Sequence, residues 1–173
     1  MIDRNLNYGR DVIKQFLQDA APYGTVLDVA AGPGEDLMNA REFSPNCRSH
    51  AIECSDYWVQ YLESNGVTVS HANIEHDKFP FEDNSFDVVI ANQIFEHTKE
   101  IFWIMHEITR ILPVGGRLII GVPNLASLHN RLLLLAGKQP SSLKNTSAHI
   151  RGYTKEDVVR LFNDCFPGGY KLI

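Results

Sequence analysis

One stretch of the chain combines residue types that suit the binding of a small cationic ligand. Residues 25–36 read Thr-Val-Leu-Asp-Val-Ala-Ala-Gly-Pro-Gly-Glu-Asp, an apolar run with one acid, Asp28, followed by a turn of small residues. Gly32 and Gly34 add no Cβ and tolerate backbone angles that other residues avoid, so the chain can pass close beneath a ligand. A helix that starts after this turn would point its backbone N–H groups at the same place.

The details of the turn exclude two common phosphate-binding motifs. A dinucleotide fingerprint needs Gly or Ala at the position that Leu37 occupies. A phosphate loop needs Gly-Lys-Ser or Gly-Lys-Thr, and neither tripeptide occurs in the chain. Asp28 stands two residues before the turn, where it would repel a pyrophosphate. A nicotinamide dehydrogenase is therefore a poor alternative, and the acid favours a cation.

Strands and helices alternate along the chain, which indicates an α/β fold with a doubly wound, mostly parallel sheet. Residues 86–91 are almost continuously apolar, as in a strand that is covered on both faces. Residues 101–112 carry an apolar stripe with helical spacing. The expected strands cover 25–29, 49–54, 67–71, 86–91, 117–122 and the start of a sixth at 170–173, and the expected helices cover 7–20, 35–42, 56–65, 101–112, 125–136 and 154–164.

Polar residues stand where these strands end. In a doubly wound sheet, ligands bind at the carboxyl ends of the strands, beside the point where the strand order reverses. Glu53 ends the second strand, where its carboxylate can accept hydrogen bonds from two ribose hydroxyls. The alternative for Glu53 is a solvated acid at a strand end. The third and fourth strands are followed by Asn73 and Asn92.

Four segments, in this order, resemble the motifs of the class I S-adenosylmethionine-dependent methyltransferases. Residues 28–34 are similar to the first motif, [DE]-x-G-x-G-x-G, with Ala30 where the pattern has its first glycine. The resemblance covers about residues 20–124. The other matching segments are Ala72-Asn-Ile-Glu75 with Phe79-Pro-Phe81, Phe86-Asp-Val-Val through Glu96-His97, and Pro113-Val-Gly-Gly-Arg-Leu118.

The resemblance implies that S-adenosylmethionine is the cofactor. It places the adenine amino group at Asn73, the purine ring against Ile74 and the methionine part over Asn92. The full set of cofactor-binding residues that we expect is Asp28, Ala30, Gly32, Gly34, Glu53, Cys54, Asn73, Ile74, Asn92 and Gln93.

Methyl transfer needs little covalent help from the protein. The sulfonium already activates the methyl group, so positioning and the exclusion of water supply most of the catalysis. An oxygen or nitrogen acceptor must still lose a proton, and histidine is a suitable base. His97 is the first catalytic candidate, His149 the second and Tyr153 a distant third. A structural role is the alternative for each of them.

The segment after the fifth strand carries the residues that we expect to contact the acceptor. Residues 149–154, His-Ile-Arg-Gly-Tyr-Thr, resemble the H-[IL]-R-x-[FY]-T stretch of small-molecule methyltransferases (UbiE/UbiG-like), including sets associated with quinone and surface-polysaccharide synthesis. Arg131 and Arg151 could hold a carboxylate or phosphate through forked hydrogen bonds. The expected substrate contacts are His129, Arg131, Arg151 and Tyr153.

Motifs for metals and for methylation of nucleobases are incomplete or missing. His106-Glu-Ile-Thr-Arg110 lacks the second histidine of H-E-x-x-H, and the segment from His71 to His76 has one residue too many for H-x-x-E-H. We therefore predict no metal site. The chain also lacks Asn-Pro-Pro-Tyr after the fourth strand and a Pro-Cys nucleophile.

The net charge of −5 is unevenly distributed. Residues 1–107 carry eighteen acids and seven Lys or Arg, whereas residues 108–155 carry no acid. This uneven distribution indicates the sign of the charge on a binding partner, or it reflects chance clustering of charges on solvated faces. Nucleic acid is not the partner that we expect. The bases of the acid-free stretch are Arg110, Arg117, Arg131, Lys138, Lys144, Arg151 and Lys155.

A chain of 173 residues is long enough for one domain with a sizeable core. We divide residues 1–173 into a cofactor-binding core (1–122), an acceptor-side insertion (123–153), and a last helix with the start of a sixth strand (154–173). The three cysteines are odd in number and lack C-x-x-C spacing, which indicates reduced thiols and a cytoplasmic location. No run approaches the ~18 apolar residues of a membrane span, and the polar N-terminus does not resemble a signal peptide.

These patterns together predict a methyltransferase that uses S-adenosylmethionine to methylate an O, N or C atom of a small, anionic or sugar-type acceptor. The alternatives are an RNA or protein methyltransferase, and a non-catalytic module of the same fold that partners an active subunit. The sheet of the family closes with an antiparallel C-terminal hairpin, which looks incomplete here. A homodimer through the exposed C-terminal sheet edge would cover that edge.

Overall fold

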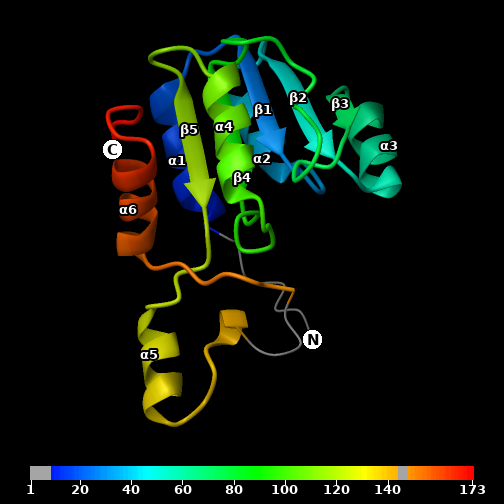
Figure 1. Ribbon diagram of the computed structural model, residues 1–173. Helices are drawn as coiled ribbons and strands as arrows, with labels where there is room; N and C mark the ends of the chain where they lie inside the picture. Colours follow the sequence, from blue (N-terminus) through cyan, green and yellow to red (C-terminus); the bar gives the residue numbers. More distant parts are fainter. Residues whose placement is uncertain (1–8, 144–147) are drawn as a thin grey trace. The chain divides into compact units, whose positions relative to one another are not determined.

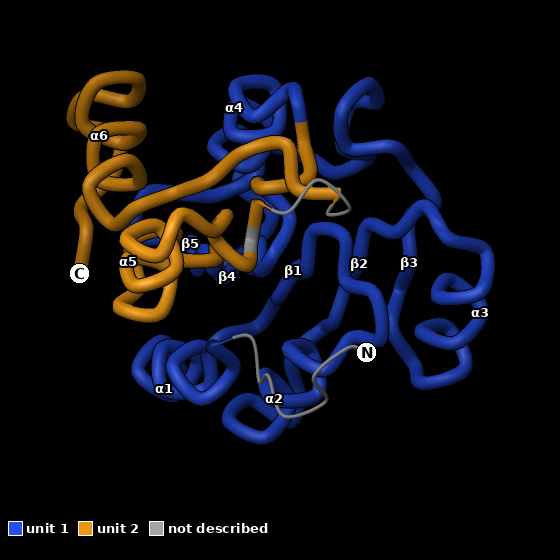
Figure 2. Tube along the Cα trace, turned by 90° about the horizontal axis from the view of Figure 1, so that it is seen from below, with its two compact units in different colours: residues 1–95, 99–121 blue, residues 96–98, 122–173 orange. Residues whose placement is uncertain are grey.

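The computed structural model describes residues 9–143 and 148–173, so that Lys144, part of the polar loop over 137–149 and the start of the helix expected at residue 7 lie outside the described residues. The chain divides into two compact units (Figure 2). Unit 1 comprises residues 1–95 and 99–121, and unit 2 comprises residues 96–98 and 122–173. The single domain that the chain length predicts stays a prediction.

Unit 1 is built on a parallel sheet with the strand order β3-β2-β1-β4-β5 (Figure 1). The strand order reverses between β1 and β4, because β4 follows β3 in the chain but lies on the other side of β1. This confirms the predicted α/β fold. The strands are β1 (Thr25–Val29), β2 (Arg48–Glu53), β3 (Thr68–His71), β4 (Val88–Asn92) and β5 (Arg117–Gly121).

Helices cover both faces of this sheet. Figure 2 shows α1 and α2 on one face and α4 on the opposite face. The central strands are therefore buried: all of β1 is buried, as are the first four residues of β4. The predicted stripe of α4 is confirmed, with Ile104, Met105 and Ile108 fully buried. The helices of unit 1 are α1 (Arg10–Ala20), α2 (Glu35–Phe43), α3 (Asp56–Ser64) and α4 (Ile101–Ile111).

Unit 2 contains helix α5 (Leu128–Leu135), a short 3-10 turn (Ser141–Leu143) and helix α6 (Lys155–Cys165). The predicted start of α6 is confirmed by a capping box, in which Thr154 and Asp157 each accept the other's backbone N–H. Helix α5 begins later than residue 125, because Ser127 caps it and Asn124 accepts the N–H of Ala126 in a local turn. Among the residues that the structure describes, no helix is long and apolar enough to span a membrane.

Our prediction of a sixth strand at residues 170–173 is wrong. These residues have no regular secondary structure. A strand needs a ladder partner, and none of the described strands pairs with this segment. The ring of Tyr170 packs instead on Phe162 of α6, with the ring centroids 5.0 Å apart, after a left-handed turn at Gly168. The homodimer through the C-terminal sheet edge stays a prediction.

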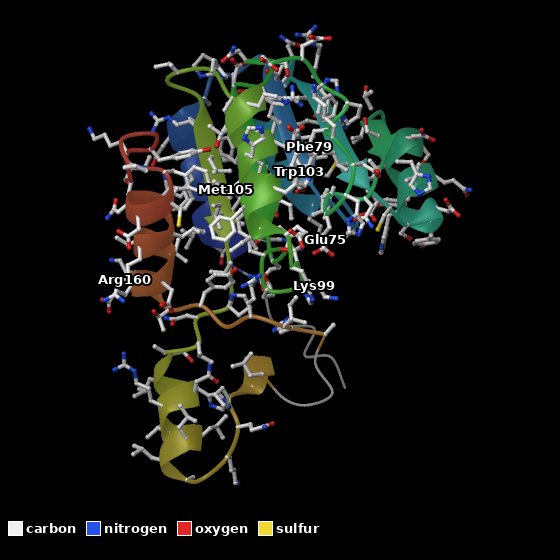
Figure 3. The ribbon with its side chains drawn as sticks, viewed as in Figure 1. Glu75, Phe79, Lys99, Trp103, Met105 and Arg160 are labelled. Carbon is white, nitrogen blue, oxygen red and sulfur yellow. The ribbon has the colours of Figure 1, made fainter. Side chains whose placement is uncertain are left out.

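Helix α4 is fixed at its N-terminus by an acid from a distant loop. The carboxylate of Glu75, which lies after β3, accepts the backbone N–H groups of Lys99 and Glu100 (Figure 3). These bonds lower the pKa of Glu75, with the Lys99 N–H as the largest cause. Glu75 thus provides the side-chain cap that the N-cap residue of α4 itself does not form.

An ion pair fixes the loop over residues 79–83 to the same helix. Glu107, only 1% exposed, accepts hydrogen bonds from the Phe79 N–H at 2.9 Å and from Arg110 Nη2 at 2.7 Å. Arg110 also donates to the carbonyls of Phe79 and Phe81 and to Asp83 Oδ1. The hydrogen bond from Arg110 is the largest cause of the lowered pKa of Glu107. The loop depends on this carboxylate.

We expect Glu107→Gln to lower the free energy of unfolding at pH 7 by about 2 kcal/mol, because one buried oxygen acceptor is lost beside Arg110. The pKa of Glu107 is depressed in the folded state. Its contribution is therefore present above the unfolded-state pKa of about 4.3 and is lost as the pH falls below that value. Urea unfolding should separate the variant from the wild type at pH 7, and the difference should shrink as the pH falls through the lowered pKa of the folded state.

The matched control is Asp83→Asn, which alters the other carboxylate partner of Arg110. The side chain of Asp83 is 68% exposed, so this change should cost under about 1 kcal/mol. Equal losses in the two variants would show that the burial of Glu107 does not matter.

Candidate active site

The carboxyl ends of β1, β2 and β4 meet at one edge of the sheet. Asp28 of β1 lies beside Ala51 of β2 on one side and Ile90 of β4 on the other. The connections that follow β1 and β4 leave toward opposite faces (Figure 2). Such a switch in strand order opens a crevice for ligands in parallel sheets.

The turn after β1 has the backbone geometry that its glycines predict. Gly32 (φ 51°) and Gly34 (φ 72°) lie in the left-handed region, and so does Ala30 (φ 62°). This explains why the resembled motif has glycine at the position of Ala30, because a Cβ there costs about 1–2 kcal/mol. The N–H of Ala30 donates to the carbonyl of Ile52 at 2.8 Å, which holds the strained residue in place.

The two glycines have different surroundings. A Cβ on Gly34 would lie 2.5 Å from Cδ2 of Leu62, so this glycine lets α2 pack closely against α3. A Cβ on Gly32 would meet no atom within 4 Å. The left-handed backbone at Gly32 therefore faces open space, as expected of a position that a ligand approaches.

Glu53 connects the turns that follow β1 and β2. Its carboxylate accepts the N–H of Gly32 through Oε2 and the N–H groups of Cys54 and Ser55 through Oε1, each at 2.8 Å. A carboxylate has about four lone-pair sites, so these bonds leave room for a further donor. The hydrogen bonds from ribose hydroxyls remain a prediction. Cys54 itself is exposed beside this carboxylate.

Two buried acids, Asp28 and Asp36, lie near one another, and Asp28 also lies near Glu53. The pKa of Asp28 is strongly raised, and burial is the largest cause. The nearby acids Asp36 and Glu53 raise this pKa further, whereas Arg10 lowers it. Burial also raises the pKa of Asp36, against the hydrogen bond from Asn92 and the charge of Arg10. The site therefore favours a positive charge. Our sequence analysis missed Asp36, although an acid in the first turn of the helix after the glycines was visible.

Asn92 at the end of β4 joins this group. Its Nδ2 donates to Oδ2 of Asp36 at 2.9 Å. Among the described residues, Oδ1 of Asn92 and Oδ1 of Asp36 are buried without a hydrogen-bond partner. Gly121 of β5 makes room for the amide, because a Cβ there would lie 2.1 Å from Asn92 Oδ1. Such buried polar atoms are rare in proteins, and a bound ligand, ion or water is one way to satisfy them.

Gln93 follows with a left-handed backbone (φ 57°), and its N–H donates to the carbonyl of Gly121 at 2.7 Å. Left-handed backbone at a residue other than glycine is uncommon and concentrates at ligand sites. Ala30 and Gln93 thus place strained backbone at the ends of both central strands.

The loop after β3 holds the residues expected at the adenine. Oδ1 of Asn73 accepts the N–H of Glu75 at 3.0 Å, and the N–H of Asn73 donates to Asp77 at 2.7 Å. An amide oxygen has two lone pairs, so it can accept a second hydrogen bond. Ile74 is buried. The adenine contacts of Asn73 and Ile74 stay predictions.

Unit 2 brings together residues that lie about fifty positions apart in the sequence. The backbone N–H groups of Ile150 and Arg151 donate to the carbonyl of Glu96, at 2.8 and 3.2 Å. Arg151 Nε donates to the carbonyl of Thr98 at 3.0 Å. The rings of His97 and His149, the two predicted base candidates, meet edge to face with centroids 4.6 Å apart.

Glu96 lies beside these imidazoles and is 1% exposed. Neither of its carboxylate oxygens has a hydrogen-bond partner within the part of the chain that the structure describes. Burial is the largest cause of its raised pKa; the dipole of its own backbone N–H lowers the pKa most, and His97 and His149 lower it further. Ligand atoms of Glu96, His97 and His149 all lie within 4.8 Å of one another. Our sequence analysis gave Glu96 no role.

The backbone determines which nitrogen of His97 carries a proton. Nδ1 of His97 lies 3.3 Å from the carbonyl oxygen of Ala148. A carbonyl only accepts hydrogen bonds, so Nδ1 carries the hydrogen and the neutral ring keeps the lone pair on Nε2. The exposed side of His97 therefore presents an atom that can take a proton or bind a metal.

The other residues expected at the acceptor occupy separate positions in unit 2. Tyr153 is buried and pairs with Asn124 in an isolated bridge. Arg131 Nε donates to the carbonyl of Ala126 at 2.8 Å. His129 of α5 meets Ser141 Oγ at 3.0 Å. An open hollow of about 540 Å³ is lined by His129, Leu133, Lys138, Gln139 and Ser141.

The sequence profile described as "Methyltransferase domain" matches residues 27–120. This is more than half of the chain, so the protein belongs to the methyltransferase domain family. The matched range contains every cofactor residue that we predicted, from Asp28 to Gln93.

Two curated relatives show how far the similarity extends. The chain is 32% identical to "Uncharacterized protein YafE" of Escherichia coli, over 85% of this chain and 64% of that protein. It is 32% identical to "Probable tRNA methyltransferase 9B" of Mus musculus, over 64% of this chain and 24% of that protein. The chain spans less than two thirds of the length of these relatives.

A solved SAM-dependent methyltransferase from Thermotoga maritima has the same fold. It shares 20% sequence identity, covers 91% of this chain and 70% of its own, and superposes with a TM-score of 0.66. Family and fold together support S-adenosylmethionine as the cofactor. The residues of unit 1 fit such a group, because orphaned polar atoms and buried carboxyl groups surround an open glycine turn.

We expect Gly32→Ala to weaken the binding of S-adenosylmethionine at least tenfold, because its Cβ would occupy the open space above the turn. Gly66→Ala is the matched control: Gly66 also has a positive φ, 72°, and an unobstructed Cβ position. Each change should lower the free energy of unfolding by about 1 kcal/mol through backbone strain. Calorimetric titration should find wild-type affinity in Gly66→Ala. Equal affinities of the two variants would mean that the ligand does not approach Gly32.

We expect Asp28→Asn to stabilise the fold at pH 8 by about 1–2 kcal/mol while weakening binding of S-adenosylmethionine, a trade of function against stability. The pKa of Asp28 is raised in the folded state. The wild type therefore loses stability as the pH rises from the unfolded-state pKa of about 3.9 through the higher pKa of the folded state. Urea unfolding at pH 4 and pH 8 should show a gap between variant and wild type only at pH 8.

The control for this change is Asp19→Asn, on the exposed side of α1. It should alter neither the stability nor its dependence on pH by more than about 0.5 kcal/mol. An Asp28→Asn variant that is less stable than the wild type at pH 8 would show that the ionised carboxylate supports the fold.

Proposed function

We propose that this chain binds S-adenosylmethionine at the carboxyl edge of β1, β2 and β4 and transfers its methyl group to a small acceptor. The observation that carries the proposal is the grouping of Asp28, Asp36 and Glu53 around the open turn at Gly32. Cationic groups of the cofactor would offset the repulsion among these carboxyl groups. When bound, the cofactor supplies an activated methyl group.

The predicted cofactor residues would bind different parts of the cofactor. Glu53 would accept the ribose hydroxyls, and the Oδ1 atoms of Asp36 and Asn92, which lack hydrogen bonds, would accept donors from the methionine part. Asn73 and Ile74 bind the adenine from the loop after β3. Ala30, Gly34, Cys54 and Gln93 shape the backbone around the cofactor.

On the acceptor side, His97 is our first candidate for the general base, since its Nε2 keeps the lone pair. His149 is the second candidate and the buried Tyr153 the third, because burial raises the pKa of this phenol. His129, Arg131 and Arg151 are proposed to contact an anionic or sugar-type acceptor. The finer assignment to the UbiE/UbiG-like type rests on residues 149–154 alone, and the cytoplasmic location rests on the three free cysteines.

An RNA acceptor is the second candidate, since one relative is named as a probable tRNA methyltransferase. The basic residues of the acid-free stretch support an RNA acceptor less than their number suggests. Arg110 is committed to Glu107 and Asp83. RNA binding that weakens steeply with added salt would favour this candidate. Turnover by the isolated chain would exclude a non-catalytic partner subunit.

The test is calorimetric titration with S-adenosylmethionine and S-adenosylhomocysteine. We expect micromolar binding to the wild type and at least tenfold weaker binding to Glu53→Ala, because the carboxylate both accepts from the ligand and holds the turn at Gly32. Glu63→Ala, an exposed acid on α3, is the control and should bind as the wild type does. Thermal unfolding of each variant checks that it is folded. A wild-type chain that binds neither compound contradicts the proposal.

A further inference from the structure

The cluster of Glu96, His97 and His149 carries a chemistry beyond proton transfer. One carboxylate and two imidazoles come together from two segments, with ligand atoms within 4.8 Å of one another. Two histidines and one carboxylate are a recurrent ligand set for first-row transition metals. We propose that Glu96, His97 and His149 bind one divalent transition-metal ion, of the kind of Zn²⁺ or Fe²⁺.

The first support is the state of Glu96. Its carboxylate is 1% exposed, and both oxygens lack a hydrogen-bond partner among the residues that the structure describes. A buried carboxylate without a partner is costly, and either a proton or a nearby cation removes that cost. The imidazoles of His97 and His149 lie beside this carboxylate, and both are metal ligands when neutral.

The second support is the tautomer of His97. Its Nδ1–H meets the carbonyl of Ala148, which leaves the lone pair on Nε2 for a metal. A hydrogen bond from the other ring nitrogen to a backbone carbonyl is the usual way in which proteins orient a metal-binding histidine.

The third support is the backbone that joins the two segments. The carbonyl of Glu96 accepts the N–H groups of Ile150 and Arg151, and the carbonyl of Thr98 accepts from Arg151 Nε. These bonds hold residues 96–98 beside residues 149–151. Ligand atoms on one tetrahedral metal are about 3.3 Å apart, so the three side chains would have to move closer together on binding.

The ligand set also limits the kind of ion. Imidazole nitrogen suits Zn²⁺ and Fe²⁺, and Co²⁺ can stand in for them, whereas Mg²⁺, Ca²⁺ and Mn²⁺ prefer oxygen ligands. Three protein ligands leave a coordination position for water or for an oxygen of the acceptor. The linear motifs on which we based the prediction of no metal could not reveal this set, because its members lie in two distant segments.

The inference deepens the proposed function and rests on it in one respect, the assignment of the cluster to the acceptor. A hydroxyl bound to the ion loses its proton more readily. In the transfer, the bond between sulfur and the methyl carbon breaks, the bond between that carbon and the acceptor oxygen forms, and the hydroxyl proton leaves to water. The imidazoles would then hold the ion, and His97 would not serve as the base.

The test is a titration of the chain with Co²⁺ after treatment with EDTA and removal of the chelator, without cofactor or acceptor. The visible absorption of Co²⁺ reports its coordination. We expect one Co²⁺ per chain in the wild type, binding at least tenfold weaker in Glu96→Gln and His149→Gln, and displacement by Zn²⁺. His106→Gln, which removes an exposed histidine of α4, is the control and should bind as the wild type does. If His149→Gln does not fold, the exposed His97→Gln replaces it.

Equal Co²⁺ affinity in His149→Gln and His106→Gln, or no stoichiometric binding by the wild type, overturns the inference. Titration of the metal-free chain with S-adenosylmethionine separates the two proposals. A chain that binds the cofactor but not Co²⁺ keeps the proposed function and loses the metal site. A chain that binds Co²⁺ through this cluster but not the cofactor keeps the metal site and loses the proposed function.

Discussion

The burial of carboxyl groups at the carboxyl edge of the sheet is the constraint on which the geometry of this edge depends. Asp28 and Asp36 are both buried, and each has a raised pKa because water is excluded from it. Selection for stability alone would replace such groups with apolar residues. Their presence makes sense if a cationic ligand restores what burial removes, and the glycine turn keeps the space open for it. A bound cationic ligand would therefore stabilise the fold by offsetting the cost of these buried carboxyl groups.

The same edge also concentrates strained backbone, and Glu53 offsets it. Ala30 and Gln93 both have left-handed backbone, one after each central strand. Glu53 accepts N–H groups from the turns after β1 and β2, so that one side chain fixes two loops. Rigid loops reduce the entropy that a ligand must overcome on binding. The geometry of the turn therefore depends on a charged side chain that is also a predicted ligand contact.

The sequence predicted most of the sheet and helices, because the burial of a parallel strand or of a helix face leaves a period that a single sequence shows. The strand expected at residues 170–173 failed because pairing depends on a partner that local pattern does not reveal. Glu53 and Asn92 were predicted because each stands at a strand end, Asp28 was predicted because it precedes the glycine turn, and their roles stay predictions. Asp36 and Glu96 were missed because their importance comes from burial and neighbours, which depend on tertiary structure. For the same reason no linear motif could bring His149 next to His97.

Each unit contains a buried carboxylate, but different groups surround it. Asp36 in unit 1 has one oxygen without a hydrogen bond, 3.8 Å from Arg10 Nε, and Glu96 in unit 2 has two such oxygens. Beside Asp36 lie an amide and open glycine backbone, which offer hydrogen bonds and space to an extended organic cation. Beside Glu96 lie two imidazoles, which offer lone pairs and suit a compact ion. Because the local groups decide which positive charge a buried carboxylate accepts, the proposed cofactor in one unit and the proposed metal ion in the other would offset the same electrostatic cost.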